Sequence, residues 1–148
     1  MSLKQKITDD MKAAMRAGNT KQRDTIRLLQ AAIKQREVDE RITLDDAAII
    51  AVIDKMLKQR KDSIAQYEAA QRFDLADAEK DEVTILSAYM PQALTDAEID
   101  ALVAAAIATS GAEGMQAMGK VMAILKPQLA GRADMGKVST LIKAKLSA

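Results

Sequence analysis

Residues 89–99 read YMPQALTDAEI, and this stretch divides the chain into two helical parts. Pro91 ends the helix before it, because proline has no amide hydrogen to donate and biases Met90 away from helical backbone. Thr95 and Glu98 have the spacing of a capping box, and the apolar run after them indicates a new helix. We therefore expect two domains, residues 1–91 and 92–148, that meet at this stretch.

Upstream of this stretch, apolar residues at helical spacing predict four helices. Gly18 and Asn19 both suit the left-handed residue that ends the first helix. Thr20, Thr43 and Asp74 are the expected N-caps of the other three, since their side-chain oxygens can accept a backbone hydrogen bond. The expected helices cover residues 3–17, 21–40, about 44–70 and a segment after 74, with Ala78, Val83, Ile85 and Leu86 as the buried residues of the fourth.

Downstream, three helices are expected, at about residues 96–109, from about 115, and at about 134–146. Gly111 suits the end of the first of these helices, and Asp134 is a plausible N-cap of the last. Pro127 lies late in the middle helix and is expected to kink it or to remove its last turn. The predicted fold class is all-α, with an N-terminal bundle of about four helices followed by a small three-helix C-terminal domain.

The composition favours helices and limits the chemistry. Ala, Leu, Ile and Met make up most of the apolar residues, with nine Met and a single Phe, which favours helix over strand. The chain has no His and no Cys, so it lacks the usual general base, the thiolate nucleophile and the usual zinc ligands. No GxxxxGK[ST] or GxGxxG motif occurs. We therefore expect no catalytic residue, no metal and no cofactor.

No feature of the sequence indicates a membrane partner. The formal net charge of +1 produces no global attraction to nucleic acid or to anionic lipid. No long apolar run and no basic-then-apolar leader occurs. The sequence therefore predicts a soluble protein located in the cytoplasm.

Two similar segments close the chain. Residues 117–129 read AMGKVMAILKPQL and residues 134–146 read DMGKVSTLIKAKL, with six of thirteen aligned positions identical. Two amphipathic helices can converge on good helix formers without a shared function, and two copies are too few for a solenoid. Each segment predicts a helix with one apolar face, formed by Val121, Ile124, Leu125 and Leu129 in the first and by Val138, Leu141, Ile142 and Leu146 in the second.

The same two segments hold the positive charge of the C-terminal part. Residues 111–148 contain six cations and two acids, whereas residues 1–110 contain sixteen cations and nineteen acids. Charge acts locally, over a Debye length of about 8 Å, so a nearly neutral chain has a basic end. Two helix N-termini here also offer amides to an anion, and glycines allow a close approach. The candidate phosphate-binding residues are Lys120, Lys126, Arg132, Lys137, Lys143, Lys145, Gly119 and Gly136.

If the partner is a nucleic acid, the contacts are expected to be with phosphate and sugar. The three aromatic residues are Tyr67, Phe73 and Tyr89, and none lies in the two segments, so base stacking is not expected. Binding would depend on salt and would read shape more than sequence. The alternative is that exposed lysines only keep a small domain in solution.

Two further basic stretches occur in the N-terminal part. One is a helical stripe and the other lies within residues 55–61, and acids interrupt both. Lysine or arginine near an acid at such spacings commonly forms surface ion pairs, so we interpret both stretches as solvent-exposed faces. The cations are Arg23, Arg27 and Lys34 in the first stretch and Lys55, Lys58, Arg60 and Lys61 in the second.

Four segments, taken in order, resemble the YqeY family over essentially the whole chain. They read MKAAMRAGNTKQRDTIRLLQAAIK, KMLKQRKDSIAQYEAAQRFDLA, YMPQALTDAEI and MGKVMAILKPQLAGRADMGKVSTLIKAKL. From about Leu94 the chain also resembles the tail domain of GatB, the B subunit of the tRNA-dependent amidotransferase. The resemblance implies an all-helical fold of two lobes, the second a small bundle of the GatB/YqeY type.

For function, the resemblance implies contact with RNA and no catalysis. The tail domain of the amidotransferase touches the tRNA body, while its catalytic domains have no counterpart in this chain. A label such as carbon–nitrogen ligase with glutamine as amido-N-donor would therefore describe that complex. One departure is that ADMGKV stands in place of a form like ADGKLV, which leaves the turn before the last helix open. The positions that match the RNA-facing surface are Lys120, Lys126, Arg132, Lys137 and Lys143.

Two functions of different classes follow. The first is a non-catalytic accessory protein that binds tRNA or another structured RNA. The second is a helical protein-interaction module that docks on an amidotransferase or another enzyme of tRNA aminoacylation or amidation, since Met-rich surfaces adapt to partners. An exposed Met and Leu patch on the second domain would favour the second function. An amidotransferase acting alone is not expected, because the chain has no His, no Cys and no nucleotide-binding loop.

Overall fold

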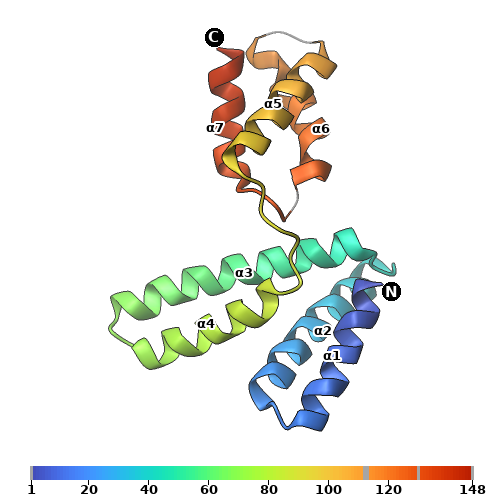
Figure 1. Ribbon diagram of the computed structural model, residues 1–148, viewed down its shortest axis with the longest axis vertical. Coiled ribbons are helices and arrows are strands. Elements are labelled where there is room, and N and C mark those ends of the chain that lie inside the picture. Colours follow the sequence, from blue (N-terminus) through green and yellow to red (C-terminus); the bar gives the residue numbers. More distant parts are fainter. Residues whose placement is uncertain (1, 112–113, 130, 148) are drawn as a thin grey trace. The chain divides into compact units, whose positions relative to one another are not determined.

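The computed structural model describes residues 2–111, 114–129 and 131–147, and these residues are helical apart from short connections (Figure 1). They contain no β-strand, which confirms the predicted all-α fold class. A short 3₁₀ helix, Met115–Ala117, precedes α6. The seven α-helices are α1 (Leu3–Ala17), α2 (Thr20–Glu40), α3 (Asp46–Ala69), α4 (Phe73–Ser87), α5 (Asp96–Ser110), α6 (Met118–Leu129) and α7 (Met135–Leu146).

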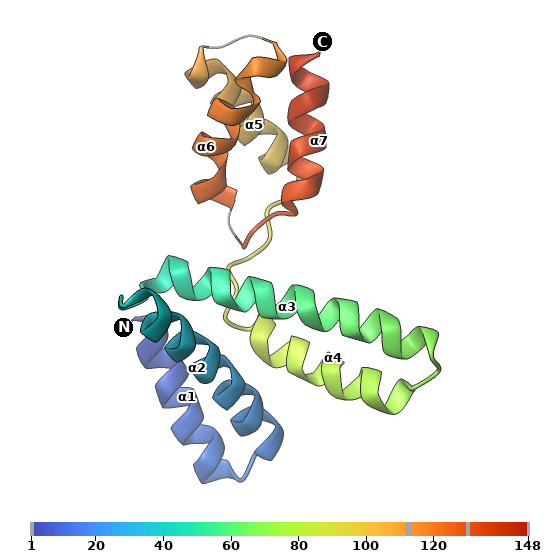
Figure 2. The same ribbon diagram turned by 180° about the vertical axis from the view of Figure 1, so that it is seen from behind.

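The chain forms two compact units, Met1–Met90 and Pro91–Ala148. In the first unit, α1 and α2 make one helical hairpin and α3 and α4 make another, as two opposite views of the ribbon show (Figures 1 and 2). In the second unit, α5 packs against both α6 and α7. The helices therefore form an N-terminal group of four and a C-terminal group of three.

The predicted N-cap of α2 is wrong by one residue. Gly18 alone takes the left-handed conformation that ends α1, with a φ of 69°. Asn19 is then extended, and its side chain accepts a hydrogen bond from the Gln22 amide. Asparagine is a better N-cap than threonine. Thr20 is therefore the first residue of the helix and not its cap.

The start of α3 also differs from the prediction. Asp45 is the N-cap, and its carboxylate accepts a hydrogen bond from the Ala48 amide at 2.9 Å. Thr43 was expected in this role. The side chain of Leu44 is buried, and its amide donates to Glu37 Oε2 at 2.8 Å, so α2 holds the residue that follows Thr43. The helix therefore begins two residues later than a cap at Thr43 would allow.

The predicted cap of α4 is wrong, since the helix begins at Phe73 and Asp74 lies in its first turn. Arg72 precedes the helix without a side-chain cap, and its guanidinium forms an ion pair with Asp74. Ala76 is buried on this helix, whereas Ala78, predicted as buried, is exposed. The other predicted core residues do pack inward, with Leu86 fully buried and Val83 and Ile85 half-buried.

The helix signals after Pro91 are mostly confirmed. Thr95 and Glu98 form the capping box, with each side chain accepting from the other residue's amide. Gly111 has a φ of 63° and ends α5. Pro127 lies inside α6, which continues to Leu129, so the last turn is retained. The helix tolerates the proline because only one backbone hydrogen bond is removed, close to the end.

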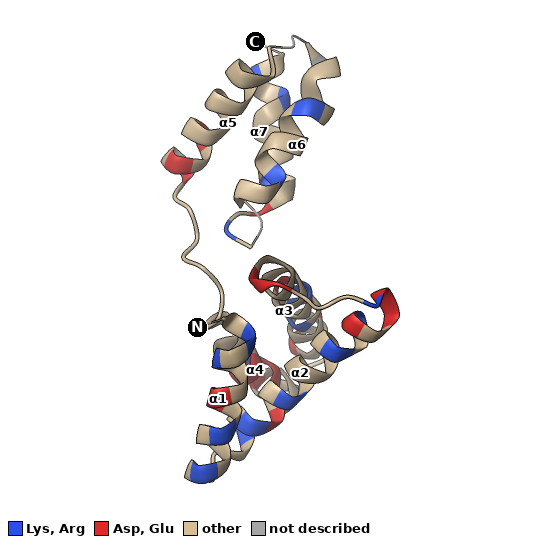
Figure 3. Cartoon of the chain, turned by 90° about the vertical axis from the view of Figure 1, so that its right-hand side faces the viewer, with Lys and Arg blue, Asp and Glu red and all other residues tan. Residues whose placement is uncertain are grey.

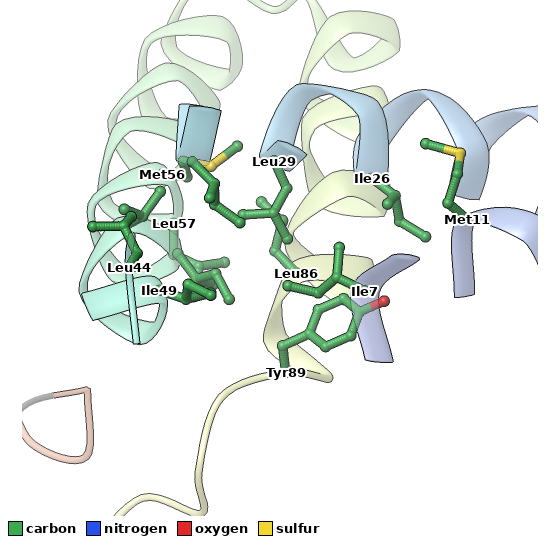
Figure 4. Packing of buried hydrophobic residues seen from close by; sticks show 13 residues of the cluster. Ile7, Met11, Ile26, Leu29, Leu44, Ile49, Met56, Leu57, Leu86 and Tyr89 are labelled. Carbon is green, nitrogen blue, oxygen red and sulfur yellow. The ribbon is translucent and has the colours of Figure 1, made fainter. Parts of the chain in front are cut away.

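The core of the first unit is built from aliphatic side chains and methionines of all four helices (Figure 4). Burial of a Leu, Ile or Met side chain is worth about 1.5–3 kcal/mol, so this cluster supplies the main favourable term of the fold. Its buried members are Ile7, Met11, Ile26, Leu29, Ile33, Leu44, Ile49, Val52, Ile53, Met56, Leu57, Leu86 and Tyr89.

Tyr89 is the one aromatic residue of this cluster, and it joins the end of α4 to α1. Its ring packs beside Ile7, and its hydroxyl donates to Asp10 Oδ2 at 2.6 Å (Figure 4). Lys6 forms an ion pair with the same carboxylate at 3.2 Å, and its ammonium lies 5.5 Å from the ring centroid. The phenol, the carboxylate and the ammonium therefore form one polar group at the edge of the core.

The core of the second unit confirms the predicted apolar faces of the last two helices. Ile124, Leu141 and Leu146 are half-buried and pack against it. Both copies of the doubled segment thus contribute their aliphatic side chains to the same cluster. Its buried members are Val103, Ala106, Ala117, Val121, Leu125, Leu129, Val138 and Ile142.

Replacing Tyr89 with phenylalanine should lower the free energy of unfolding by about 1 kcal/mol. The substitution removes a hydrogen bond to a carboxylate, but Asp10 is partly exposed and keeps Lys6, so the loss lies below the range for a fully buried charged partner. Urea unfolding followed by circular dichroism measures this. Tyr67→Phe is the matched control, because the described residues include no hydrogen-bond partner of the Tyr67 hydroxyl. Equal stability of the two variants would contradict the role of the Tyr89 hydroxyl.

The first unit should lose stability in alkaline solution because of Tyr89. Burial, followed by the hydrogen bond to Asp10, raises the pKa of Tyr89 far above its ordinary value. Above a pH of about 10, the unfolded chain therefore loses the phenolic proton while the folded chain retains it, so unfolding becomes easier as the pH rises. Unfolding curves between about pH 8 and pH 11 test this. The loss should be smaller in Tyr89→Phe than in Tyr67→Phe, and an unchanged loss in Tyr89→Phe would refute it.

Candidate nucleic-acid interface

Four lysines of the last two helices are exposed and without an acidic partner. Lys120 and Lys126 lie on α6, and Lys137 and Lys143 lie on α7 (Figure 3). Among the described residues, no carboxylate forms an ion pair with any of them. The apolar faces of the two helices are turned into the core of the second unit, so these side chains extend into solvent. They are the part of the predicted site that is available to an anion.

Lys145 differs from the other lysines of the predicted site. Its ammonium lies 3.0 Å from a carboxylate oxygen of Asp100 on α5, and its side chain is only 31% exposed. Its charge is therefore already compensated within the chain. The sequence offered no indication of this pair, because Asp100 belongs to another helix.

Arg132 connects two segments of the second unit. Its Nε donates to the carbonyl oxygen of Gln92 at 3.2 Å, and its own carbonyl accepts from the Leu94 amide at 3.0 Å. The Arg132 amide in turn donates to the carbonyl oxygen of Leu129 at 2.9 Å. Arg132 thus connects the end of α6 with the segment that precedes α5. The residue therefore has a structural role besides its charge.

Acids from α5 lie close to the start of α7. A cavity of about 370 Å³ between the two helices has Ile99, Val138 and Leu141 among its lining residues, and its other residues are Asp96, Asp100, Asp134 and Lys137. The α5 acids precede the basic segment 111–148 in the sequence. In the folded chain they lie next to Lys137. The unit that begins at residue 91 contains six cations and five acids. Near this cavity the charges of Lys137 and Lys145 are thus offset by acids, and Lys120, Lys126 and Lys143 lie outside its lining.

The N-terminus of α7 is capped by a side chain of the chain itself. Asp134 is the N-cap, as predicted, and its Oδ1 accepts from the Gly136 amide at 2.8 Å. A Cβ atom at residue 136 would lie 3.2 Å from the same oxygen, so Gly136 fits its own cap. A Cβ atom at Gly119 would meet nothing within 4 Å. The cap therefore uses one amide of this helix N-terminus, and contact of Gly136 with an anion stays a prediction.

Both basic stretches of the first unit are paired only in part. In residues 55–61, Lys58 pairs with Asp54 and Arg60 pairs with Glu82 of α4. Of the three cations of the α2 stripe, Arg23 pairs with the neighbouring Asp24. The predicted pairing fails for the other cations of both stretches, which are exposed and have no acidic partner among the described residues: Arg27, Lys34, Lys55 and Lys61.

The described part of the chain holds neither a metal-binding cluster nor a membrane-spanning helix. No three side chains of Asp, Glu, His or Cys gather in a way that could hold a metal ion. None of the helices found there combines the length and the apolar character that are needed to cross a bilayer.

The fold and the surface define a small all-α protein of two helical units, the second with an exposed basic hairpin. A family model described as Yqey-like protein matches residues 4–146. The chain therefore belongs to the YqeY-like family.

Its relatives include fungal proteins named Altered inheritance of mitochondria protein 41, mitochondrial. The one from Pyrenophora tritici-repentis is 32% identical over 130 residues, which are 86% of this chain and 71% of that protein. The one from Lachancea thermotolerans is 38% identical over 100 residues, which are 66% of this chain and 54% of that protein. The chain thus spans about half the length of the Lachancea protein. The names place these relatives in mitochondria, and the cytoplasmic location of this chain stays a prediction.

Asp134→Ala should destabilise the start of α7 by about 1 kcal/mol, because an N-cap that accepts from the helix is lost. Hydrogen exchange of the α7 amides in the full chain measures this local effect. Asp134→Asn is the control, since an asparagine oxygen can accept the same hydrogen bond. Faster exchange is expected in the alanine variant only. If the asparagine variant exchanges as fast as the alanine variant, the side chain of residue 134 does not act as a cap.

Proposed function

We propose that this chain is a non-catalytic accessory protein that binds tRNA or another structured RNA through the hairpin of α6 and α7. The observation that carries the proposal is the exposure of Lys120, Lys126 and Lys143 without an acidic partner among the described residues. Lysines placed in this way attract phosphate groups and release bound counterions when they meet an RNA backbone.

The burial pattern supports contact with the backbone in preference to the bases. The aliphatic side chains of both helices are used in the core, and neither helix contains an aromatic residue on which a base could stack. Lys137 contributes less than the other three lysines, because Asp96, Asp100 and Asp134 line the same cavity. The binding surface therefore centres on α6 and on the side of α7 that carries Lys143.

The distribution of exposed apolar residues favours RNA binding over a docking module on the second unit. Large exposed hydrophobic side chains are found in the first unit, and the described side chains of residues 91–147 include none of them. A helix-to-helix interface normally needs an apolar centre. The residues in question are Met15, Leu28, Val38, Ile42 and Phe73.

The test is a titration of the full chain with unfractionated tRNA at salt concentrations from about 50 to about 200 mM, followed by fluorescence anisotropy. Lys126→Glu with Lys143→Glu should weaken binding about tenfold or more at low salt, because each phosphate contact contributes to the salt dependence. The slope of log K against log salt should fall by about 2. Absence of salt-dependent binding by the wild-type chain, or unchanged binding by the double variant, would refute the proposal.

Lys145 supplies a matched control on the same helix. Lys143→Gln and Lys145→Gln remove the same charge two residues apart, but Lys145 is held by Asp100 and Lys143 is unpaired. Lys143→Gln should therefore reduce binding more than Lys145→Gln does. Equal losses of affinity would mean that binding depends only on the total charge of the unit. Such a result would refute a specific binding site on the hairpin.

A further inference from the structure

The positive charge of the first unit is gathered on one of its two hairpins. Residues 2–41, which contain α1 and α2, hold ten cations and six acids. Residues 42–90, which contain α3 and α4, hold six cations and ten acids. The two excesses cancel, so the unit is neutral as a whole. The α1–α2 hairpin is therefore a second basic region, which a count over residues 1–110 conceals.

Four of the six acids of the α1–α2 hairpin form ion pairs with its own cations, whereas Asp9 and Asp39 accept from glutamine amides and keep their charge. Five exposed cations of the hairpin have no acidic partner among the described residues: Lys12, Arg16, Arg27, Lys34 and Arg41. The acids and their donors are Asp9 with Gln5, Asp10 with Lys6 and Tyr89, Asp24 with Arg23, Glu37 with Lys4 and the Leu44 amide, Asp39 with Gln35, and Glu40 with Arg36.

Lys34 lies in the groove between α1 and α2, and helical spacing places Lys12 and Arg27 on the same side of the hairpin. Thr8 of α1 and Lys34 of α2 both line a cavity of about 320 Å³ there. Residues four or seven apart share one side of a helix. Lys12 therefore continues the stripe of Thr8 along α1, and Arg27 continues the stripe of Lys34 along α2. Since the two helices run antiparallel, both steps lead toward the turn at Gly18, and the three cations share one face of the hairpin.

The composition of this face favours a polyanion over a lipid surface. A helix that lies in a membrane interface needs a continuous apolar face for the acyl region. The apolar faces of α1 and α2 are used in the core, through Ile7, Met11 and Ile26 among others. Three large apolar side chains of these helices, Met15, Leu28 and Val38, remain exposed, but they do not form a continuous face. Residues 2–41 contain no aromatic residue, so base stacking is excluded there as well. The phosphate groups of a folded RNA can bind to a surface of this kind, because their binding requires positive charge and no apolar contact.

We infer that the α1–α2 hairpin is a second phosphate-binding surface for structured RNA, with Lys12, Arg27 and Lys34 as its contact residues. The inference rests on the proposed function for its partner, but its site lies in the other unit. The units are joined through the short segment 91–95, so an RNA held by one unit is present at high effective concentration for the other. Two modest surfaces then bind one RNA more tightly than either does alone.

The test compares two double variants of the full chain in the same tRNA titration. Arg27→Gln with Lys34→Gln removes two charges from the inferred surface, and Lys55→Gln with Lys61→Gln removes two exposed, unpaired charges from α3. The first variant should lower the slope of log K against log salt by about 2, and the control should leave it nearly unchanged. None of the four substituted side chains forms an ion pair with a described residue, so both variants should fold. Circular dichroism verifies this.

The outcomes separate this inference from the proposed function. If the Arg27 and Lys34 variant binds as the control does while the Lys126 and Lys143 variant is impaired, the second surface is refuted and the C-terminal hairpin remains. If only the Arg27 and Lys34 variant is impaired, this surface stands and the C-terminal hairpin is refuted. Wild-type chain that binds vesicles containing phosphatidylserine through Arg27 and Lys34, and does not bind tRNA, would overturn both.

Discussion

Carboxylates connect the helices of this chain, and both units depend on these connections. Glu37 of α2 binds the Lys4 ammonium of α1 and also the Leu44 amide at the approach to α3. Asp10 of α1 holds the Tyr89 hydroxyl at the end of α4. An exposed ion pair adds little free energy by itself. A carboxylate that also caps a helix or accepts from a backbone amide fixes where a helix begins, and this determines which side chains reach the core.

Because many acids form caps and ion pairs within the units, unpaired cations remain on the surface. Most acids near a basic surface are engaged, either at helix N-termini, as Asp134 is, or in pairs between helices, as Asp100 is. Among the described residues, most of the cations that remain unpaired lie on the α1–α2 hairpin and on α6 and α7, and two more, Lys55 and Lys61, lie on α3. Because salt screens charge beyond about 8 Å, a phosphate near one of these surfaces responds to the local excess. A net charge of +1 is therefore compatible with binding to RNA.

The sequence predicted the features that depend on neighbours along the chain. Helical periodicity located the apolar faces of α6 and α7, and the capping box at Thr95 depends on a residue three positions away. The cap of α3 failed because the backbone before it is held by Glu37 of another helix. The same limit applies to Arg132, whose partner Gln92 is 40 residues away, and to Lys145 beside Asp100. Contacts of this range follow from packing, which no local pattern contains.

The unpaired cations also have a cost in the folded state, and this bears on why a partner is expected. Arg27 and Lys34 are held two turns apart on a rigid helix, with no acid of their own and with Lys12 on the adjacent helix. Two turns correspond to about 11 Å, so salt screens most of the repulsion between these like charges, and the remainder becomes smaller when the chain unfolds. A polyanion that binds the folded chain removes the repulsion and, by mass action, stabilises that state over the unfolded chain. An anion that binds these cations, as proposed, would therefore also stabilise the folded chain.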